Sequence, residues 1–143
     1  MLHVFISGLL TLADGYIKRH REDNDNTYSY LNDKVKIITY HNKGAFLGKG
    51  ANKPFAVTVI SVMLTAILSI VFVITLTTKG SRALRTGLSL ILGGAFSNTY
   101  DRLRKGYVVD YIVFSKAPGF LKNVVFNISD FAIIIGSLIT VLH

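Results

Sequence analysis

The sequence predicts an all-α membrane protein with four transmembrane helices and a small β-rich element at one membrane face. Half of the 143 residues are hydrophobic, and they are concentrated in blocks. The predicted spans are residues 2–17, 55–78, 84–103 and 124–142. The second of these is uncharged and long enough to cross a hydrocarbon core of about 30 Å. A chain of this length fits a single domain, residues 1–143.

Two polar segments separate these blocks and fall on the same membrane face if the spans alternate in direction. Residues 18–54 contain a β-branched stretch at 35–40 that predicts a strand, and residues 104–123 contain a second one at 107–114. Polar, non-helical backbone is tolerated only outside the hydrocarbon or when it is buried in protein. We therefore expect both segments to form a folded extramembrane element.

Composition narrows the classes of partner and cofactor. The formal charge of +8 indicates loops that contact anionic lipid headgroups, so we expect membrane lipid as a partner and no nucleic acid. The chain has no cysteine, which excludes disulfides and thiolate metal sites. Its four histidines lack metal-ligand spacing, and we predict no metal and no cofactor.

The first span ends beside two opposite charges. Asp14 and Lys18 are spaced i, i+4, on one helix face, where they can form an ion pair. In the alternative reading, Lys18 extends from the helix end toward the lipid headgroups. We expect residues 18–32 to be a solvated surface loop.

The third span carries the most informative stretch. Counting back from Asp101 in steps of four gives Ser97, Gly93 and Ser89, a stripe of small side chains typical of closely packed membrane helices. Asp101 is therefore expected to face protein and not lipid. An ionisable side chain inside a membrane is costly and is a functional-site hypothesis by default.

A second carboxylate, Asp130, is expected in the first turns of the fourth span. Because adjacent spans run in opposite directions, Asp101 and Asp130 are predicted at the same membrane face. Two carboxylates about 4 Å apart repel by roughly 4 kcal/mol at an effective dielectric constant near 20. This repulsion corresponds to about three pKa units, so the pair would share one proton and could perform acid–base catalysis on water.

The residues by themselves leave three classes of function open. The carboxylate pair of Asp101 and Asp130 suits an acid–base enzyme, and it suits a proton- or ion-conducting membrane protein equally well. In the third reading, Arg102 pairs with Asp101 and makes it structural.

Five ordered motifs are distributed along the chain between residues 14 and 130. Residues 93–103 read G-G-A-x-x-N-x-x-D-R-L, residues 106–112 read G-x-V-V-D-x-I, and residues 126–130 read F-N-x-x-D. Residues 42–45 read N-x-G-A, and residues 14–18 place an Asp four positions before a Lys. Together these motifs resemble signal peptidase II, the lipoprotein signal peptidase family of bacteria.

The resemblance implies an aspartyl endopeptidase that removes the signal peptide in front of a diacylglyceryl-modified cysteine of a prolipoprotein. It implies a multi-pass protein of the bacterial cytoplasmic (inner) membrane, with a β-rich extracytoplasmic element and an active site near the outer face. The catalytic pair carries over to Asp101 and Asp130. Positions expected to bind substrate or orient the site match Asn98, Arg102, Asn127, Asn42, Asp14, Gly94, Val109 and Asp110. We expect a monomer.

The implied orientation puts residues 79–85 in the cytoplasm and the two long loops outside. The basic residues by themselves favour the opposite orientation, although long folded loops translocate largely regardless of charge.

The chain departs from the family pattern at four positions. These are Ile17 in place of Ser or Thr, Phe46 in place of a small residue, Val113 in place of Asp, and Ser129 in place of the Ala of the motif F-N-x-A-D. Both catalytic positions are kept, so we expect peptidase activity with an altered fit to substrate or lipid near Phe46. A catalytically silent paralogue is the further alternative.

Overall fold

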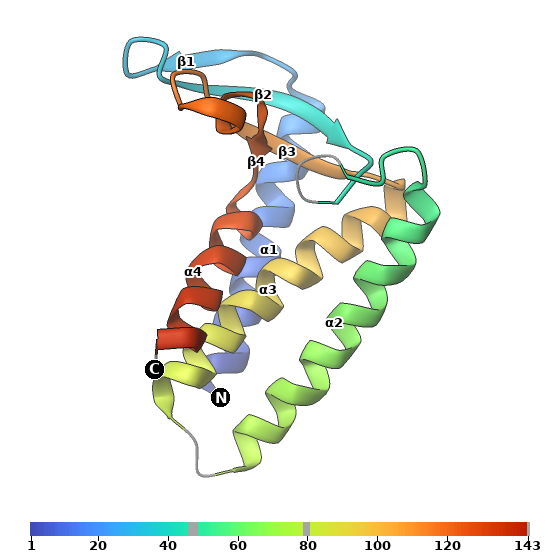
Figure 1. Cartoon of the computed structure of the whole chain (residues 1–143), viewed down its shortest axis with the longest axis vertical. Coiled ribbons are helices and arrows are strands. Elements are labelled where there is room, and N and C mark those ends of the chain that lie inside the picture. Colours follow the sequence, from blue (N-terminus) through green and yellow to red (C-terminus); the bar gives the residue numbers. More distant parts are fainter. Residues whose placement is uncertain (46–48, 79–80, 143) are drawn as a thin grey trace.

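The computed structural model of the chain describes residues 1–45, 49–78 and 81–142. Within them, four α-helices form one body, and an antiparallel sheet covers one end of it (Figure 1). The helices are α1 (Leu2–Asp23), α2 (Pro54–Thr77), α3 (Arg82–Lys105) and α4 (Ile128–Leu142). The strands are β1 (Tyr28–Tyr30), β2 (Val35–Asn42), β3 (Val108–Phe114) and β4 (Val125–Phe126), in that order across the sheet, and a 3₁₀ helix, η2 (Gly119–Asn123), precedes β4.

The ends of α2 and α3 follow from local sequence. Pro54 opens α2, at a position where its missing N–H costs nothing. Ser81 caps α3, because its hydroxyl oxygen accepts a hydrogen bond from the backbone N–H of Ala83 at 3.1 Å. Gly106 ends α3 with a φ of 80°, a left-handed conformation that glycine adopts without strain. The chain can therefore turn from α3 almost directly into β3.

Helix α3 is the centre of the helical body and packs against the other three helices. A Cβ atom on Gly93 would lie 2.8 Å from a backbone oxygen of α1, and one on Gly94 would lie 2.5 Å from the backbone oxygen of Ser129 in α4. Toward α2, the hydroxyl groups of Thr99 and Thr65 are hydrogen-bonded at 2.8 Å. The small-residue stripe expected on this helix therefore packs against protein, as predicted.

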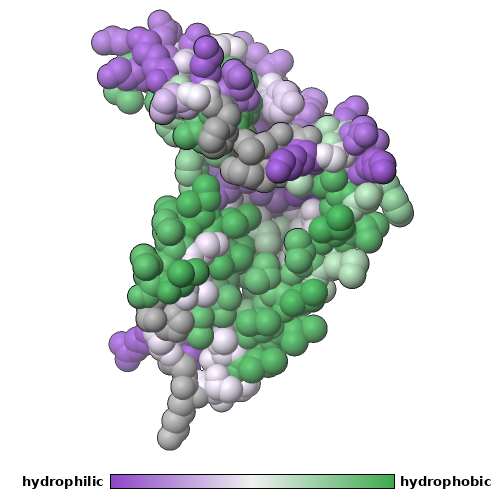
Figure 2. Space-filling model, in the orientation of Figure 1, coloured by the Kyte–Doolittle hydropathy of each residue, from purple (hydrophilic) through white to green (hydrophobic). Residues whose placement is uncertain are grey.

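Hydrophobic residues gather over the helical body and hydrophilic residues over the sheet (Figure 2). Helix α2 exposes large apolar side chains along its length, among them Phe55, Met63 and Ile70. Among the described residues, α2 is the one helix long and apolar enough to cross a membrane, and α4 is apolar but shorter.

The predicted strands at 35–40 and 107–114 are confirmed as β2 and β3. The two strands pair antiparallel, with Tyr40 opposite Asp110 and Asn42 opposite Val108. Because side chains alternate along a strand, these four residues face one side of the sheet. That side is the one that covers the cavity described below.

Two element boundaries differ from the sequence prediction. Helix α1 continues to Asp23, so the prediction of a solvated loop that begins at Lys18 is wrong. Lys18 is 1 % exposed, which excludes the reading in which it reaches the lipid headgroups. The fourth helix begins only at Ile128, and residues 125–126 belong to β4, where they pair with β3.

Candidate active site

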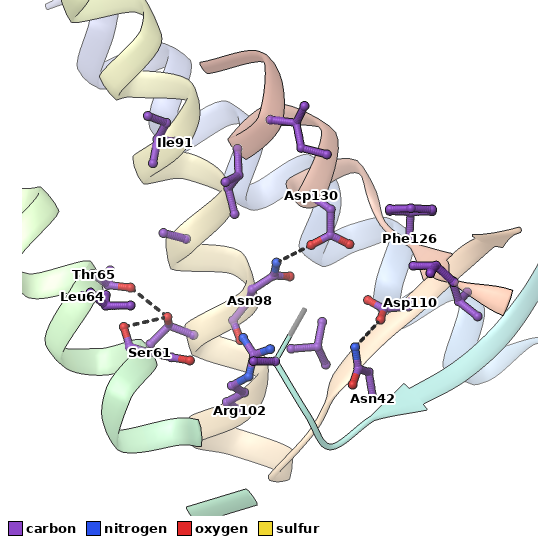
Figure 3. A pocket seen from close by; sticks show the side chains of 18 of the residues that line it. Asn42, Ser61, Leu64, Thr65, Ile91, Asn98, Arg102, Asp110, Phe126 and Asp130 are labelled. Atoms are coloured by element: carbon purple, nitrogen blue, oxygen red, sulfur yellow. Dashed lines mark hydrogen bonds between the residues drawn. The ribbon is translucent and has the colours of Figure 1, made fainter. Parts of the chain in front are cut away.

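A cavity of about 610 Å³ lies where α2, α3, α4 and the sheet meet. Five of the residues predicted for the site line it, namely Asn42, Asn98, Arg102, Asp110 and Asp130 (Figure 3). The apolar part of the lining includes Leu64, Leu68, Ile91, Ile133 and Ile134. The cavity therefore joins two carboxyl groups to an apolar compartment between helices.

Asp130 is fixed by the start of α4. Its backbone N–H donates to Asn127 Oδ1 at 2.9 Å, and its Oδ2 accepts from the backbone N–H of Asn127 at 3.0 Å. This reciprocal pair is a capping box, with Asn127 in the N-cap role and Asp130 three positions later. The capping box leaves Oδ1 of Asp130 for a third partner.

That partner is Asn98, from the middle of α3. Its Nδ2 donates to Asp130 Oδ1 at 3.0 Å, and its Oδ1 accepts from Asn127 Nδ2 at 3.1 Å and from Lys18 Nζ at 2.8 Å. With the amide oxygen held by two donors, the amide nitrogen can only point toward Asp130. Asn98 thereby connects α1 and α3 to the carboxylate of α4.

Asp110 faces the same cavity from strand β3. Its Oδ2 accepts from Asn42 Nδ2 at 2.9 Å, and its Oδ1 accepts from Asn127 Nδ2 at 2.6 Å. Burial, followed by the negative charge of Asp130, raises the pKa of Asp110 to about 7. The hydrogen bonds from the two asparagines act in the opposite direction and only partly offset these effects.

Asp101 has different surroundings and is absent from the cavity lining. Its carboxylate lies 3.0 Å from Lys105 Nζ and 3.4 Å from Lys18 Nζ, and it accepts a hydrogen bond from the backbone N–H of Val109 at 3.2 Å. Together these three contacts fix the carboxylate in place. The catalytic role predicted for Asp101 stays a prediction, and its contacts are those of a residue that supports β3.

Asp14 and Lys18 form the predicted ion pair, at 2.8 Å, and both are buried. Asp14 also accepts hydrogen bonds from the hydroxyl groups of Ser97 in α3, Ser129 in α4 and Tyr111 in β3. The remaining predicted positions, Val109 and Gly94, act through the backbone. The backbone N–H of Val109 donates to Asp101. Gly94 lets α3 approach α4 next to Ser129, as described above.

Arg102 borders the cavity about one helical turn after Asn98 in α3 (Figure 3). Its Nη2 donates to the backbone oxygen of Gly44 at 3.0 Å. Its Nε is buried and has no hydrogen-bond partner. Arg102 therefore does not form the ion pair with Asp101 that the third reading of the sequence proposed as the structural role of Asp101.

The family model for signal peptidase II matches residues 6–143 of this chain. The chain belongs to the signal peptidase II family. Relatives named lipoprotein signal peptidase include one from Halothermothrix orenii, 35% identical over 79% of this chain and 72% of that protein. Another, from Halalkalibacterium halodurans, is 31% identical over 95% of this chain and 86% of that protein. A third, from Caldanaerobacter subterraneus, is 36% identical over 71% of this chain and 66% of that protein.

Solved structures show the same fold. One bacterial membrane enzyme superposes with a TM-score of 0.84 at 22% identity, covering 99% of this chain and 85% of that enzyme. A second superposes with a TM-score of 0.80, covering 99% of this chain and 90% of that enzyme.

Two residues at the site make contacts that the sequence did not predict. Tyr111 links three elements, because its hydroxyl donates to Asp14 and accepts from the backbone N–H of Ile128 at 3.2 Å. Lys18 was predicted to pair with Asp14, but its contacts with Asn98 and Asp101 were not predicted. For Tyr111, the position directly after a motif aspartate was the available signal.

The departures from the family pattern have different outcomes. Ser129 uses its hydroxyl group to bind Asp14, so this departure adds a buried hydrogen bond. Val113 lies opposite Lys36 and Val125 within the sheet, outside the cavity lining. Phe46 lies outside the described residues. Among the described residues, no group of three or more His, Cys, Asp or Glu side chains could hold a metal ion.

Proposed function

We propose that this member of the signal peptidase II family is an aspartyl endopeptidase that removes the signal peptide from diacylglyceryl-modified prolipoproteins. The family match over residues 6–143 and the relatives named lipoprotein signal peptidase support this substrate class. The mixed cavity also suits it, because a peptide bond would meet the carboxyls while an acyl chain meets the apolar lining.

The proposal includes a multi-pass arrangement in the bacterial cytoplasmic membrane, with the four helices as spans and the sheet on the outer face. The apolar surface of the helical body supports it (Figure 2), as does the likeness to two membrane enzymes. In this arrangement the carboxyls lie near the outer face, and a single chain supplies the complete site.

We assign the catalytic pair to Asp110 and Asp130, with Asp110 in place of Asp101. The observation that carries the assignment is that one residue, Asn127, hydrogen-bonds both carboxylates at the cavity. Asp101 is instead held between two ammonium groups. Asp101 is also absent from the cavity lining, so a substrate bound in the cavity would meet Asp110 and Asp130 and not Asp101.

The raised pKa of Asp110 supports Asp110 as the proton donor and Asp130 as the proton acceptor. Protonated Asp110 gives its proton to the oxygen of the scissile carbonyl, while ionised Asp130 accepts a proton from the attacking water. The water oxygen forms the new bond to carbon and gives a tetrahedral intermediate. This intermediate collapses as the C–N bond breaks, and the leaving nitrogen takes the proton from Asp130. The hydroxyl group made from the carbonyl oxygen returns its proton to Asp110 as the C=O bond re-forms, so both carboxyls regain their starting states.

The surrounding residues keep the two carboxyls distinct. Asn98 and the backbone N–H of Asn127 hold Asp130 in its orientation, and Asn42 holds Asp110. Arg102 places a positive charge beside the cavity, where it can bind a substrate carbonyl oxygen.

The test is cleavage of a purified diacylglyceryl-modified prolipoprotein in detergent, with mass spectrometry to identify the bond. The expected product begins with the lipid-modified cysteine, and the unmodified precursor should be a poor substrate. A silent paralogue would cleave neither, in an assay where a known signal peptidase II works. A conducting protein would instead carry proton or ion flux in liposomes that is lost on replacing Asp110 or Asp130.

A further inference from the structure

A second cluster of charges lies behind the site, where α1, α3 and the sheet meet. Its centre is Glu22, close to the end of α1. Glu22 Oε2 accepts from Lys105 Nζ at 2.6 Å, and Oε1 accepts from the Tyr107 hydroxyl at 3.0 Å. The Nε2 of His41 lies 3.8 Å from Glu22 Oε1, and the His41 ring lies 4.2 Å from the ring of Tyr107. None of these four residues lines the cavity.

The cluster is connected to the site through Asp101. Lys105 contacts Glu22 with the same ammonium group that lies 3.0 Å from Asp101 Oδ1. The other oxygen of Asp101 accepts the backbone N–H of Val109. Val109 directly precedes Asp110, so this hydrogen bond fixes the backbone next to the proposed proton donor.

Strand alternation explains why the cluster can support the site without entering it. His41 pairs with Val109 in the β2–β3 register, one residue away from Asn42 and Asp110 on their strands. Side chains at alternate positions point to opposite faces of a sheet. The sheet therefore presents Asn42 and Asp110 to the cavity and His41 to Glu22 on the other face.

We infer that Glu22 and Lys105 are positioning residues for Asp110. The side chains of Glu22 and Lys105 are 24% and 26% exposed, so water competes for the ammonium group. Glu22 keeps the ammonium in place by binding it from α1, and Lys105 can then hold Asp101 against Val109. The inference rests on the proposed function, because positioning matters only if Asp110 takes part in cleavage.

The test compares Glu22→Gln and Lys105→Met with matched controls. Asp23→Asn and Arg104→Gln remove the same charges from the exposed neighbouring residues. We expect Glu22→Gln and Lys105→Met each to lower kcat about tenfold or more and to leave KM nearly unchanged. The reason is that a small misplacement of a reacting group lowers the rate of the chemical step strongly. The controls should keep kcat, and Lys105→Arg should restore most of it, because it keeps a cation with several donors.

Two further readouts separate positioning from a general loss of stability. The double variant Glu22→Gln/Lys105→Met should be no slower than the slower single variant, because both act through Asp101. Amide hydrogen exchange of residues 108–110 should be faster in Glu22→Gln and Lys105→Met than in the controls. The inference is overturned if exchange there matches the controls, or if melting temperature falls while kcat is kept.

Failure of the proposed function would look different. If the wild-type protein cleaves no prolipoprotein, the peptidase assignment fails. The exchange measurement would still decide whether Glu22 and Lys105 hold the backbone at Asp110.

Discussion

Asn127 and Asp130 bind each other twice, through Asn127 Oδ1 with the Asp130 backbone N–H at 2.9 Å and Asp130 Oδ2 with the Asn127 backbone N–H at 3.0 Å. The same Asn127 side chain donates to Asp110. The residue that caps the start of α4 is therefore also the residue that sets the two carboxyls relative to each other. Helix capping and site geometry depend on one side chain.

Asn127→Ala should damage stability and catalysis together. Loss of an N-cap costs about 1–2 kcal/mol. Release of both carboxyls should lower kcat by roughly 100-fold, because their orientation is no longer fixed. Thermal unfolding in detergent and steady-state cleavage measure the two effects. Asn52→Ala, at an exposed asparagine, is the control, and equal behaviour of the two variants would contradict the account.

Cleavage should depend on the proton of Asp110. Burial and the charge of Asp130 raise its pKa to about 7, so the donor is protonated below that pH and ionised above it. We expect kcat/KM, whose pH dependence reports pKa values of the free enzyme, to fall as pH rises through about 7. A rate that keeps rising to pH 9, in a protein that stays folded, would speak against Asp110 as the proton donor.

The same shift predicts the direction of the stability change with pH. Because the pKa of Asp110 is higher in the folded protein than its usual value of 3.8, this group favours folding at low pH. That contribution is lost as pH rises from about 4 to about 7. Replacing Asp110 with Asn should flatten this part of the pH dependence of the melting temperature.

Asn42→Ala should move the pH profile in a defined direction. Asn42 donates a hydrogen bond to the Asp110 carboxylate and so favours its ionised form. Its removal should raise the pKa of Asp110 and shift the fall in kcat/KM to higher pH. The pH dependence of kcat/KM checks this, and a shift to lower pH would contradict the role given to Asn42.

Gly94→Ala should separate α3 from α4. An added Cβ atom would lie 2.5 Å from the backbone oxygen of Ser129, next to Asp130. We expect a loss of about 1–3 kcal/mol in stability, together with reduced cleavage. Gly15→Ala is the matched control, since a Cβ atom added there would have nothing within 4 Å and alanine favours helix. Equal melting temperatures of the two variants would contradict this packing role.

Much of this arrangement could be predicted from sequence because it follows local rules. Hydrophobic blocks predicted the helices, and β-branched residues predicted β2 and β3. The small residues every fourth position before Asp101 correctly predicted that it faces protein, and it is 4% exposed.

Which protein groups Asp101 meets could not be predicted in this way. One of its two cations, Lys18, is contributed by a helix far away in sequence, and burial of Lys18 reflects tertiary packing of α1 against α3. Asp110 was predicted only to bind substrate or orient the site, for a related reason. It lies in a strand outside the hydrophobic blocks, so the cost of a charge within a membrane did not single it out.

The central claim is that Asp110 and Asp130 form the catalytic pair and that Asp101 supports them. The most direct measurement is cleavage and melting temperature of Asp110→Asn, Asp130→Asn and Asp101→Asn beside the wild-type protein. We predict that Asp110→Asn and Asp130→Asn each remain folded and cleave nothing. Asp101→Asn should lower both the melting temperature and the activity, because the ammonium groups of Lys18, which is buried, and of Lys105 lose their charge partner. An Asp110→Asn variant that still cleaves at the wild-type rate would contradict the assignment.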